Sequence, residues 1–358
     1  MNIKGPFTKI AFENINLDSS DQVKKYLLSV GWIPTEYNFS KTTGERTSPK
    51  LTEDSFSSIK DDTGKLVSER SVLVHRRRLL QNIEDPENKG LISLIREDGR
   101  ITAGAIICAT PTARASHIGI VNIPRVSTAL GKEIRELFYC LPPYVQLGLD
   151  LASIETRVLA HFTTSYDGGE YWNYINEVPD IHRATADILG CDRNTAKTFR
   201  YALFYGAKAA KISRTLGCTI DEAQCKLDSF WEKEKGVKLV IDYLEAYYKK
   251  HGFIVGLDGR KIYIRQKHKL LNSLIQTSAS IIFKRWKVIM INELKKQGLD
   301  AKLIISMHDE MQFRVHSDIV EDVKTIGLES AVLAGEFYKL NVPILADAKI
   351  GSNWAECH

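Results

Sequence analysis

The spacing of apolar residues predicts three groups of β-strands along the chain. Apolar and polar residues alternate over 91–96 and 101–108, and the Asp-Gly turn pair between them predicts a β-hairpin that starts a sheet. The apolar run Val145–Asp150 predicts a strand that ends on a carboxylate. Near the C-terminus, 303–315 predicts a second hairpin, because two apolar runs flank a short, highly charged connection.

Helical patterns fill most of the sequence between these strands. Ser20–Val30 predicts a short amphipathic helix, and the polar stretch Asn38–Lys65 predicts a surface loop or an insertion. From Ile154 to about residue 295 the pattern is mostly helical, and it ends in a long helix over Asn272–Lys296. The order of strands, helices and strands predicts an α+β fold in which a helical block is inserted into a sheet domain.

Composition narrows the class of protein without identifying it. The 358 residues include 49 basic and 44 acidic ones, and the net charge of +5 suits a polyanionic partner. The longest apolar runs, such as Ala103–Ala109, fall far below the roughly 18 residues of a membrane span, so no membrane association is expected. The six cysteines show neither a C-x-x-C pair nor zinc spacing. We therefore expect a reduced protein of the cytoplasm.

Positive charge is concentrated between Arg193 and Ile220, where six basic residues and no acidic residue occur in 28 positions. Within this segment Arg193, Lys197, Tyr201 and Tyr205 follow one another at intervals of four, so a helix carries all of them on one side. Guanidinium and ammonium groups bind phosphate oxygens, and aromatic rings stack on bases. This side of the helix is therefore suited to binding a nucleotide. A solvated basic face with two half-buried tyrosines explains the spacing equally well.

Two aspartates are candidates for a metal site. Asp150 ends a predicted strand, and Asp309 lies 159 residues later in the connection of the C-terminal hairpin. Mg²⁺ prefers oxygen ligands, and two ions about 3.5–4 Å apart activate an attacking hydroxyl and stabilise a leaving pyrophosphate. A single aspartate at a strand end is more often a cap or turn residue. The consecutive polar residues His308, Asp309 and Glu310 are less easily explained in that way, because they interrupt an apolar hairpin.

Three segments match the motifs of a known family in order and in spacing. Asp150–Arg157 resembles motif A of the family A DNA polymerases, the bacterial polymerase I group. Arg193–Gly206 resembles motif B, and His308–Glu310 resembles motif C. Further segments are similar to the replicative polymerases of T-odd coliphages: Asp180–His182, Leu257–Lys261 and Asn353–His358.

The resemblance runs from about Pro6 to His358 and implies a right-hand architecture with a palm and inserted fingers. The implied divisions are an N-terminal region with the polar loop that leads into the palm (1–89), a first palm part with motif A (90–165), fingers with motif B (166–285), and a second palm part with motif C and the C-terminal tail (286–358). The exonuclease domain and the thumb, with its thioredoxin-binding loop, are expected to be absent.

This expected absence implies a split enzyme. A second polypeptide would supply the exonuclease and the thumb, and a thioredoxin-like processivity factor would act only through that partner. An excised fragment or a minimal polymerase is the other interpretation of the same resemblance.

The resemblance implies that the chain is a DNA polymerase that acts on primer–template DNA and dNTPs. It also implies two Mg²⁺ ions as cofactors, for which Mn²⁺ is a substitute. The implied metal ligands are the Asp150 and Asp309 carboxylates and the Leu151 carbonyl. Lys197 is implied to protonate the leaving pyrophosphate. The residues implied to bind the dNTP are His182, Arg193, Lys197, Tyr201, Glu155 and Tyr205.

Glu155 is implied to be a steric gate, held by Tyr205, that excludes the ribose 2′-hydroxyl. Tyr201 stands where some relatives have Phe, and it predicts ready acceptance of dideoxynucleotides. Arg157 is implied to brace motif A, and Glu310 is implied to be a structural carboxylate rather than a full metal ligand. The residues implied to contact primer–template DNA are Arg114, Arg125, Asn272, Gln276 and His308.

The sequence also departs from the family pattern on the primer side. Thr112-Ala113-Arg114 stands where the family usually has Thr-Gly-Arg, and alanine adopts a positive φ less readily than glycine. Ser127 lies where a primer-contacting arginine is expected, and Arg125 is a candidate substitute.

Three alternatives to a DNA polymerase fit the sequence less well. A catalytically idle nucleic-acid-binding or scaffold derivative has no need of a metal pair or a sugar gate. A two-metal nuclease predicts more clustered carboxylates and no nucleotide-binding stripe. A single-chain phage-type RNA polymerase is disfavoured because Glu155 at the gate would exclude ribonucleotides.

Overall fold

The computed structural model describes residues 14–40, 46–85, 90–120, 123–204 and 206–357. Contacts divide the chain into two compact units, 1–102 and 103–358. No helix in these described ranges is long and apolar enough to cross a membrane.

The N-terminal unit consists mainly of two helices joined by a short antiparallel hairpin. Its elements are α1 (Ser20–Ser29), β1 (Tyr37–Phe39), β2 (Arg46–Pro49), the 3₁₀ helix η1 (Glu53–Ser58), α2 (Asp62–Leu80) and the 3₁₀ helix η2 (Leu91–Leu94). α1 confirms the helix predicted over Ser20–Val30. α2 begins where the Asp61 carboxylate accepts a hydrogen bond from the Gly64 N–H at 2.7 Å, which is a typical helix N-cap.

The polar stretch Asn38–Lys65 is not only a surface loop, and that part of the prediction is wrong. Ile59 from this stretch is buried with Val23, Leu27 and Trp32 in a small apolar core. The Trp32 indole N–H donates to the Ser55 hydroxyl at 2.9 Å, so the polar residues also satisfy a buried donor. The described part of the stretch therefore belongs to the folded unit.

The hairpin predicted at 91–108 is also wrong in its first strand. Leu91–Leu94 forms η2, and an isolated bridge joins Ile95 to Ile101. Gly90 has a φ of +86°, and the Ser93 hydroxyl donates back to the Gly90 carbonyl at 2.7 Å. This local hydrogen bond competes with strand pairing. In the second unit, β3 (Gly104–Ile106) pairs instead with β4 (Ser116–Ile118).

The second unit is built on an antiparallel sheet in the order β10-β5-β9-β8. Its strands are β5 (Tyr144–Leu151), β8 (Ala301–Met307), β9 (Glu310–His316) and β10 (Ala346–Gly351). β5 confirms the strand predicted at Val145–Asp150, and β8 with β9 confirms the C-terminal hairpin. The register places Asp150 directly opposite Glu310, so two segments that are distant in sequence meet at one end of the sheet.

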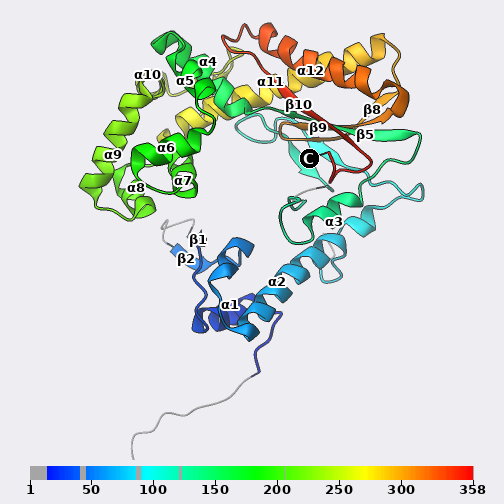
Figure 1. Cartoon of the computed structure of the whole chain (residues 1–358), viewed down its shortest axis with the longest axis horizontal. Helices are drawn as coiled ribbons and strands as arrows, with labels where there is room; N and C mark the ends of the chain where they lie inside the picture. Colours follow the sequence, from blue (N-terminus) through cyan, green and yellow to red (C-terminus); the bar gives the residue numbers. More distant parts are fainter. Residues whose placement is uncertain (1–13, 41–45, 86–89, 121–122, 205, 358) are drawn as a thin grey trace, which may run out of the picture. The chain divides into compact units, whose positions relative to one another are not determined.

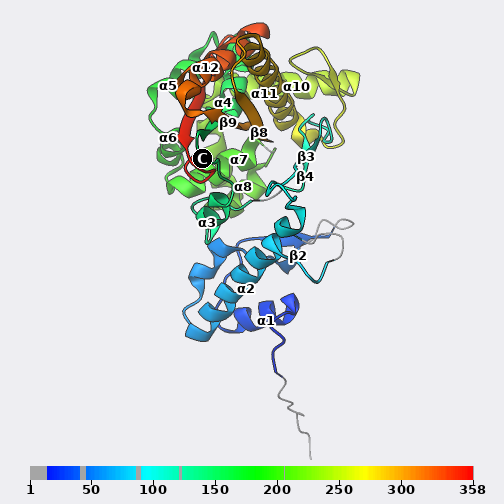
Figure 2. The same cartoon turned by 90° about the vertical axis from the view of Figure 1, so that its right-hand side faces the viewer.

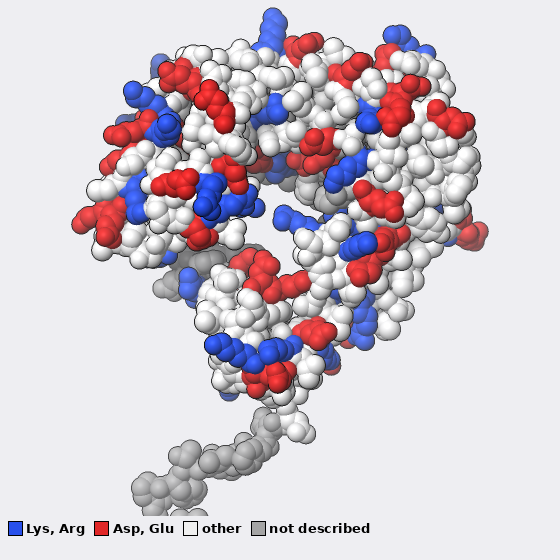
Figure 3. All heavy atoms as spheres, viewed as in Figure 1, with Lys and Arg blue, Asp and Glu red and all other residues white. Residues whose placement is uncertain are grey.

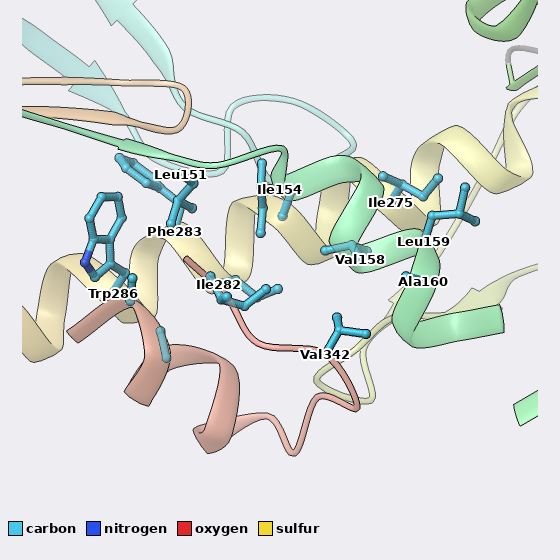
Figure 4. Packing of buried hydrophobic residues seen from close by; sticks show 14 of the residues in the cluster. Leu151, Ile154, Val158, Leu159, Ala160, Ile275, Ile282, Phe283, Trp286 and Val342 are labelled. Atoms are coloured by element: carbon cyan, nitrogen blue, oxygen red, sulfur yellow. The ribbon is translucent and has the colours of Figure 1, made fainter. Parts of the chain in front are cut away.

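Two long helices cover the apolar face of this sheet, as Figures 1 and 2 show. α12 (Val320–Phe337) packs on β5, β9 and β10, and α11 (Leu270–Lys296) packs on α12 and on α4 (Ile154–Asp167). α11 confirms the predicted long helix. Figure 4 shows Leu151 of β5 beside Phe283 and Trp286 of α11 in the main core. Burial of these large side chains fixes β5, and with it Asp150.

The predicted helical block lies between β5 and β8 in the chain. Leu189, Phe199, Ile212 and Phe230 give α6 to α9 a core of their own. The other helices of this unit are α3 (Gly131–Glu136), α5 (Glu170–Glu177), α6 (Ile181–Leu189), α7 (Arg193–Phe204), α8 (Ala209–Leu216), α9 (Ile220–Lys233) and α10 (Lys235–His251). Short elements complete it: β6 (Ile254–Val255), β7 (Lys261–Ile262), η3 (Lys267–Lys269) and η4 (Ser317–Ile319).

Candidate active site

Asp150 and Asp309 lie at the same end of the sheet and line one cleft. Asp150 is the penultimate residue of β5, and Asp309 is in the two-residue turn between β8 and β9. The Leu151 N–H donates to the Asp309 carbonyl at 3.2 Å, so strand pairing holds the two segments together. The cleft has a volume of about 410 Å³. Its lining also includes Leu151, Glu155, His182, Arg200, Tyr201 and Asn272.

The backbone on both sides of the cleft adopts a conformation that is uncommon outside glycine. Ser153, which turns the chain from β5 into α4, has a φ of +51°, and His308, in the hairpin turn before Asp309, has a φ of +50°. Such strain persists where surrounding contacts fix it, and it clusters at functional sites. The Arg157 guanidinium donates to the carbonyls of Ala152 and Pro343, both at 2.8 Å. Arg157 thus braces the turn after β5.

α7 confirms the helix predicted from the basic stretch, from Arg193 to Phe204. Tyr201 lines the cleft, whereas Arg193 and Lys197 are exposed on the same helix and do not line it. The Arg193 guanidinium instead pairs with Asp180, with 2.5 Å between Nε and Oδ2. Figure 3 shows Lys and Arg side chains gathered along the edge of the block formed by α6 and α7. Tyr205 lies outside the described residues.

His182 from α6 faces Tyr201 in the cleft, with 6.3 Å between the ring centroids. Its Nδ1 is buried and has no hydrogen-bond partner among the described residues. Burial, followed by the positive charge of Arg200, lowers the pKa of His182 below its ordinary value. A buried polar atom without a partner is costly, so this ring is suited to a ligand that supplies one.

Arg200 of α7 is a cleft residue whose role the sequence analysis missed. Its side chain is only 4% exposed, and both of its terminal nitrogens donate to the buried Glu234 carboxylate, Nη2 to Oε2 at 3.3 Å. It also donates to the Thr185 hydroxyl at 3.1 Å and to the Tyr171 hydroxyl at 3.3 Å. One of the six basic residues is therefore neutralised inside the helical block rather than available to phosphates. No local pattern in the sequence distinguishes it from its exposed neighbours.

Glu155, in the first turn of α4, is paired with Arg114. The Arg114 Nη2 donates to the Glu155 Oε1 at 2.7 Å, and the two side chains are 30% and 41% exposed. Ala113 beside it has a φ of +58°, so alanine adopts the left-handed conformation that the sequence analysis regarded as costly. The Ala113 carbonyl accepts hydrogen bonds from Ser280 at 2.8 Å and from Lys284 at 2.6 Å. Both donors lie on α11, and they hold the segment in this conformation.

The residues predicted to contact DNA are only partly together. Asn272 lines the cleft, and Gln276 follows it by one turn on α11. His308 stacks edge to face on His117 of β4, with 5.7 Å between the centroids. Arg125 is exposed in the segment before α3 and is not part of the cleft lining.

The sequence profile of DNA polymerase family A matches residues 2–356, which is nearly the whole chain. The chain belongs to DNA polymerase family A. The predicted family is therefore confirmed, and the sheet with its inserted helices is the α+β palm and fingers fold of that family.

Relatives within family A support the same assignment. The DNA-directed DNA polymerase of Enterobacteria phage T3 is 27% identical over 99% of this chain and 54% of its own length. DNA polymerase I of Pseudomonas aeruginosa is 31% identical over 70% of this chain and 29% of its own length. The chain thus spans about half the length of the phage relative.

A solved structure shares the fold. The POL domain of Pol1 from M. smegmatis, in complex with DNA primer-template and dNTP, has a TM-score of 0.75 and 24% sequence identity to this chain. The similarity covers 96% of this chain and 62% of that chain.

The donors at the cleft of this family A chain fit divalent magnesium. The two aspartates and the Leu151 carbonyl supply oxygen, the ligand that Mg²⁺ prefers. Among the described residues, no group of three or more His, Cys, Asp or Glu side chains is placed so that it could hold a metal ion. A site with two carboxylates suits Mg²⁺ well, because this ion usually keeps water and substrate phosphates as its remaining ligands.

Proposed function

We propose that the chain is a template-directed DNA polymerase that joins a deoxynucleotide to a primer 3′-hydroxyl. The observation that carries the proposal is the cleft that collects side chains from β5, α4, α6, α7, α11 and the β8–β9 turn: Asp150, Glu155, His182, Tyr201, Asn272 and Asp309. Membership of DNA polymerase family A supports the same chemistry. The chain spans about half of its phage relative, so activity and substrates are inferred here for the part that contains the cleft.

Asp150 and Asp309, with the Leu151 carbonyl, would hold two Mg²⁺ ions, or Mn²⁺ in their place. Bound there, the ions supply activation of the primer hydroxyl and neutralisation of charge on the phosphates. The chain's own part is to hold the two carboxylates at adjacent strand ends by the β5–β9 pairing.

The nucleotide would lie along α6 and α7. His182, Arg193 and Lys197 are the proposed phosphate-binding residues, since cationic and N–H donors form strong charge-assisted hydrogen bonds with phosphate oxygens. Binding would require Arg193 to exchange Asp180 for phosphate, and its exposure allows that change. Lys197 would donate a proton from Nζ to the leaving pyrophosphate. Tyr201 and Tyr205 would pack on the base and sugar.

Glu155 is proposed as the sugar gate, with its carboxylate in the space that a ribose 2′-hydroxyl needs. The contact that supports this role is its ion pair with Arg114, which fixes the orientation of the carboxylate. Arg114 is thus proposed to serve both the gate and the primer, beside Arg125, Asn272, Gln276 and His308 as contacts to primer–template DNA.

We propose the palm as 90–165 with 286–358 and the fingers as 166–285. The chain order supports an inserted block, because the helices α5 to α10 come between strands of one sheet, whereas the boundary at 285 falls within α11. The second polypeptide and the thioredoxin-like factor that the sequence analysis expects stay predictions. An idle nucleic-acid-binding protein is disfavoured, because it would not need two aspartates and a paired glutamate in one cleft.

The test is primer extension by Asp150→Asn and Asp309→Asn variants, with DNA affinity measured in parallel by fluorescence anisotropy. Metal binding supplies several kcal/mol of transition-state stabilisation, so each variant should lose about 100-fold or more in extension rate. DNA affinity should stay within about threefold, because neither carboxylate binds the duplex by charge.

Asp322→Asn is the control of equal charge. Asp322 is exposed in the first turn of α12 and does not line the cleft, so its loss removes one negative charge without changing the proposed metal site. Extension that survives in Asp150→Asn or Asp309→Asn, or that is lost equally in the control, would contradict the proposed function.

A further inference from the structure

Polar side chains are buried on the face of the sheet opposite the apolar core, beside Asp150 on the same face. Leu147, Leu149 and Leu151 of β5 point into the core, so the alternate residues of this strand, including Gln146, point to the other face. Gln146 and Gln312 are fully buried there, and Glu310 is 8% exposed. Burial of amides and a carboxylate is costly unless hydrogen bonds compensate for it. The residues that cover this face must therefore supply partners.

The C-terminal segment, residues 352–357, forms this cover. A Cβ on Gly148 would lie 2.3 Å from the Cys357 carbonyl oxygen, so the segment packs against the bare backbone of β5. The Cys357 thiol donates to the Gln146 carbonyl at 3.2 Å. Trp354 is fully buried, and its backbone N–H donates to the Phe138 carbonyl at 2.9 Å. The end of the described chain is therefore an integral layer of the sheet domain.

Trp354 and Gln312 on this covered face both donate to Glu310. The Trp354 indole N–H donates to Glu310 Oε1 at 2.7 Å, and the Gln312 amide donates to the same oxygen at 2.6 Å. The Arg135 guanidinium lies 4.4 Å from the centre of the Trp354 ring, which fixes the indole through a cation–π contact. Hydrogen bonds to a carboxylate are short and strong, so this arrangement fixes its orientation.

Glu310 lies close to both aspartates of the proposed metal site. Glu310 is directly opposite Asp150 in the β5–β9 register and follows Asp309 in sequence. Directly opposed residues have Cβ atoms about 4.5–5.5 Å apart, so a glutamate there is within reach of a cation held by the two aspartates. Asp150 and Asp309 line the cleft, whereas Glu310 does not. The contacts with Trp354 and Gln312 thus separate the third carboxylate from the other two.

We propose that Trp354 and Gln312 are positioning residues that keep Glu310 away from the cation site, so that the C-terminal segment sets the charge of that site. This inference rests on the proposed function, because it requires divalent cations at Asp150 and Asp309. A merely structural Trp354 would fill the same space, but it would have no effect on cation affinity once the fold is intact.

The test is Mn²⁺ binding to the full chain without DNA or nucleotide, measured by the electron paramagnetic resonance of free Mn²⁺. Trp354→Phe keeps a buried aromatic ring and removes the N–H donor. Released from it, Glu310 adds its carboxylate to the site, and Mn²⁺ should bind about threefold tighter or more. Glu310→Gln in the Trp354→Phe background should return the affinity to that of the wild type, and Glu310→Gln alone should change it by less than about twofold.

Gln312→Met removes the other donor at similar volume and should change the affinity in the same direction, which keeps the test available if Trp354→Phe folds poorly. Thermal unfolding of each variant checks the fold. Mn²⁺ affinity that is unchanged or weaker in both folded single-donor variants would overturn the inference. Asp150→Asn separates this inference from the proposed function on which it rests. If Asp150→Asn binds Mn²⁺ as well as the wild type does, the proposed metal site is wrong, whatever the affinity of Trp354→Phe.

Discussion

Because Arg200 and Glu234 form a buried ion pair, we expect the substitution Glu234→Gln to lower the stability of the chain strongly. The two side chains are 4% and 1% exposed, so Glu234→Gln leaves a guanidinium without a counter-charge inside the helical block. Removing one partner of a buried ion pair costs about 3–5 kcal/mol, and we expect about 3 kcal/mol because glutamine keeps one acceptor oxygen. The remaining partners, Thr185 and Tyr171, are neutral hydroxyls and cannot replace the charge.

The assay is thermal and urea unfolding of the wild type and the variant. For a unit of this size about 3 kcal/mol corresponds to a fall in Tm of about 6–12 °C. Asp242→Asn is the control, because Asp242 pairs with Lys238 on the exposed side of α10, with 51% and 42% of the side chains accessible, and its loss should cost under about 1 kcal/mol. Equal stabilities of Glu234→Gln and Asp242→Asn would refute the reasoning. The double variant Arg200→Met with Glu234→Leu should recover most of the loss, since apolar residues of similar volume often replace a buried pair without penalty.

Three further perturbations address the cleft. Ala113→Gly should stabilise the chain by about 0.5–1 kcal/mol in urea unfolding, because glycine adopts the positive φ at this position without strain. Ala246→Gly in the exposed middle of α10 is the control and should destabilise the chain by about 1 kcal/mol. A change of the same sign in both variants would contradict backbone strain at Ala113. Glu155→Ala should raise ribonucleotide relative to deoxynucleotide incorporation by about tenfold, equivalent to about 1.4 kcal/mol, and an unchanged ratio in competition assays would remove Glu155 from the gate. Because the pKa of His182 is lowered by burial and by Arg200, the stability contributed by its neutral ring is complete above about pH 6.5 and declines as the pH falls; an NMR titration with a pKa above that value would contradict this.

Local patterns were sufficient for the elements that carry the cleft. β5, the β8–β9 hairpin, α7 and α11 each have a clear apolar period and a definite end, and the structure confirms them. The N-terminal unit was harder to predict from the sequence, because local side-chain hydrogen bonds and few apolar residues obscure the pattern there. The run at 91–96 alternates like a strand, but the Ser93 hydroxyl bonds to Gly90 and closes a 3₁₀ turn. The polar stretch before α2 contains few apolar residues, and one of them, Ile59, is nevertheless in the core.

The contacts that shape the cleft join residues far apart in the chain, and no period in the sequence encodes them. Glu155 pairs with Arg114 across 41 positions, and Trp354 reaches Glu310 across 44. Arg200 resembles the exposed cations around it and becomes buried only because Glu234 enters from the start of α10. Such pairs follow from the packing of α4, α7 and the sheet. The family motifs point to the candidate residues, but not to the partners that orient them.

The central claim is that this cleft selects each incoming nucleotide by its pairing with the template base. Single-nucleotide addition tests this claim most directly. The purified chain is mixed with Mg²⁺, a primer, and four templates that differ only at the first unpaired base, and each dNTP is offered alone. We expect rapid addition of the complementary nucleotide on each template, and loss of that addition in Asp309→Asn. No addition by the wild-type chain, or addition of the same nucleotide on all four templates, would contradict it.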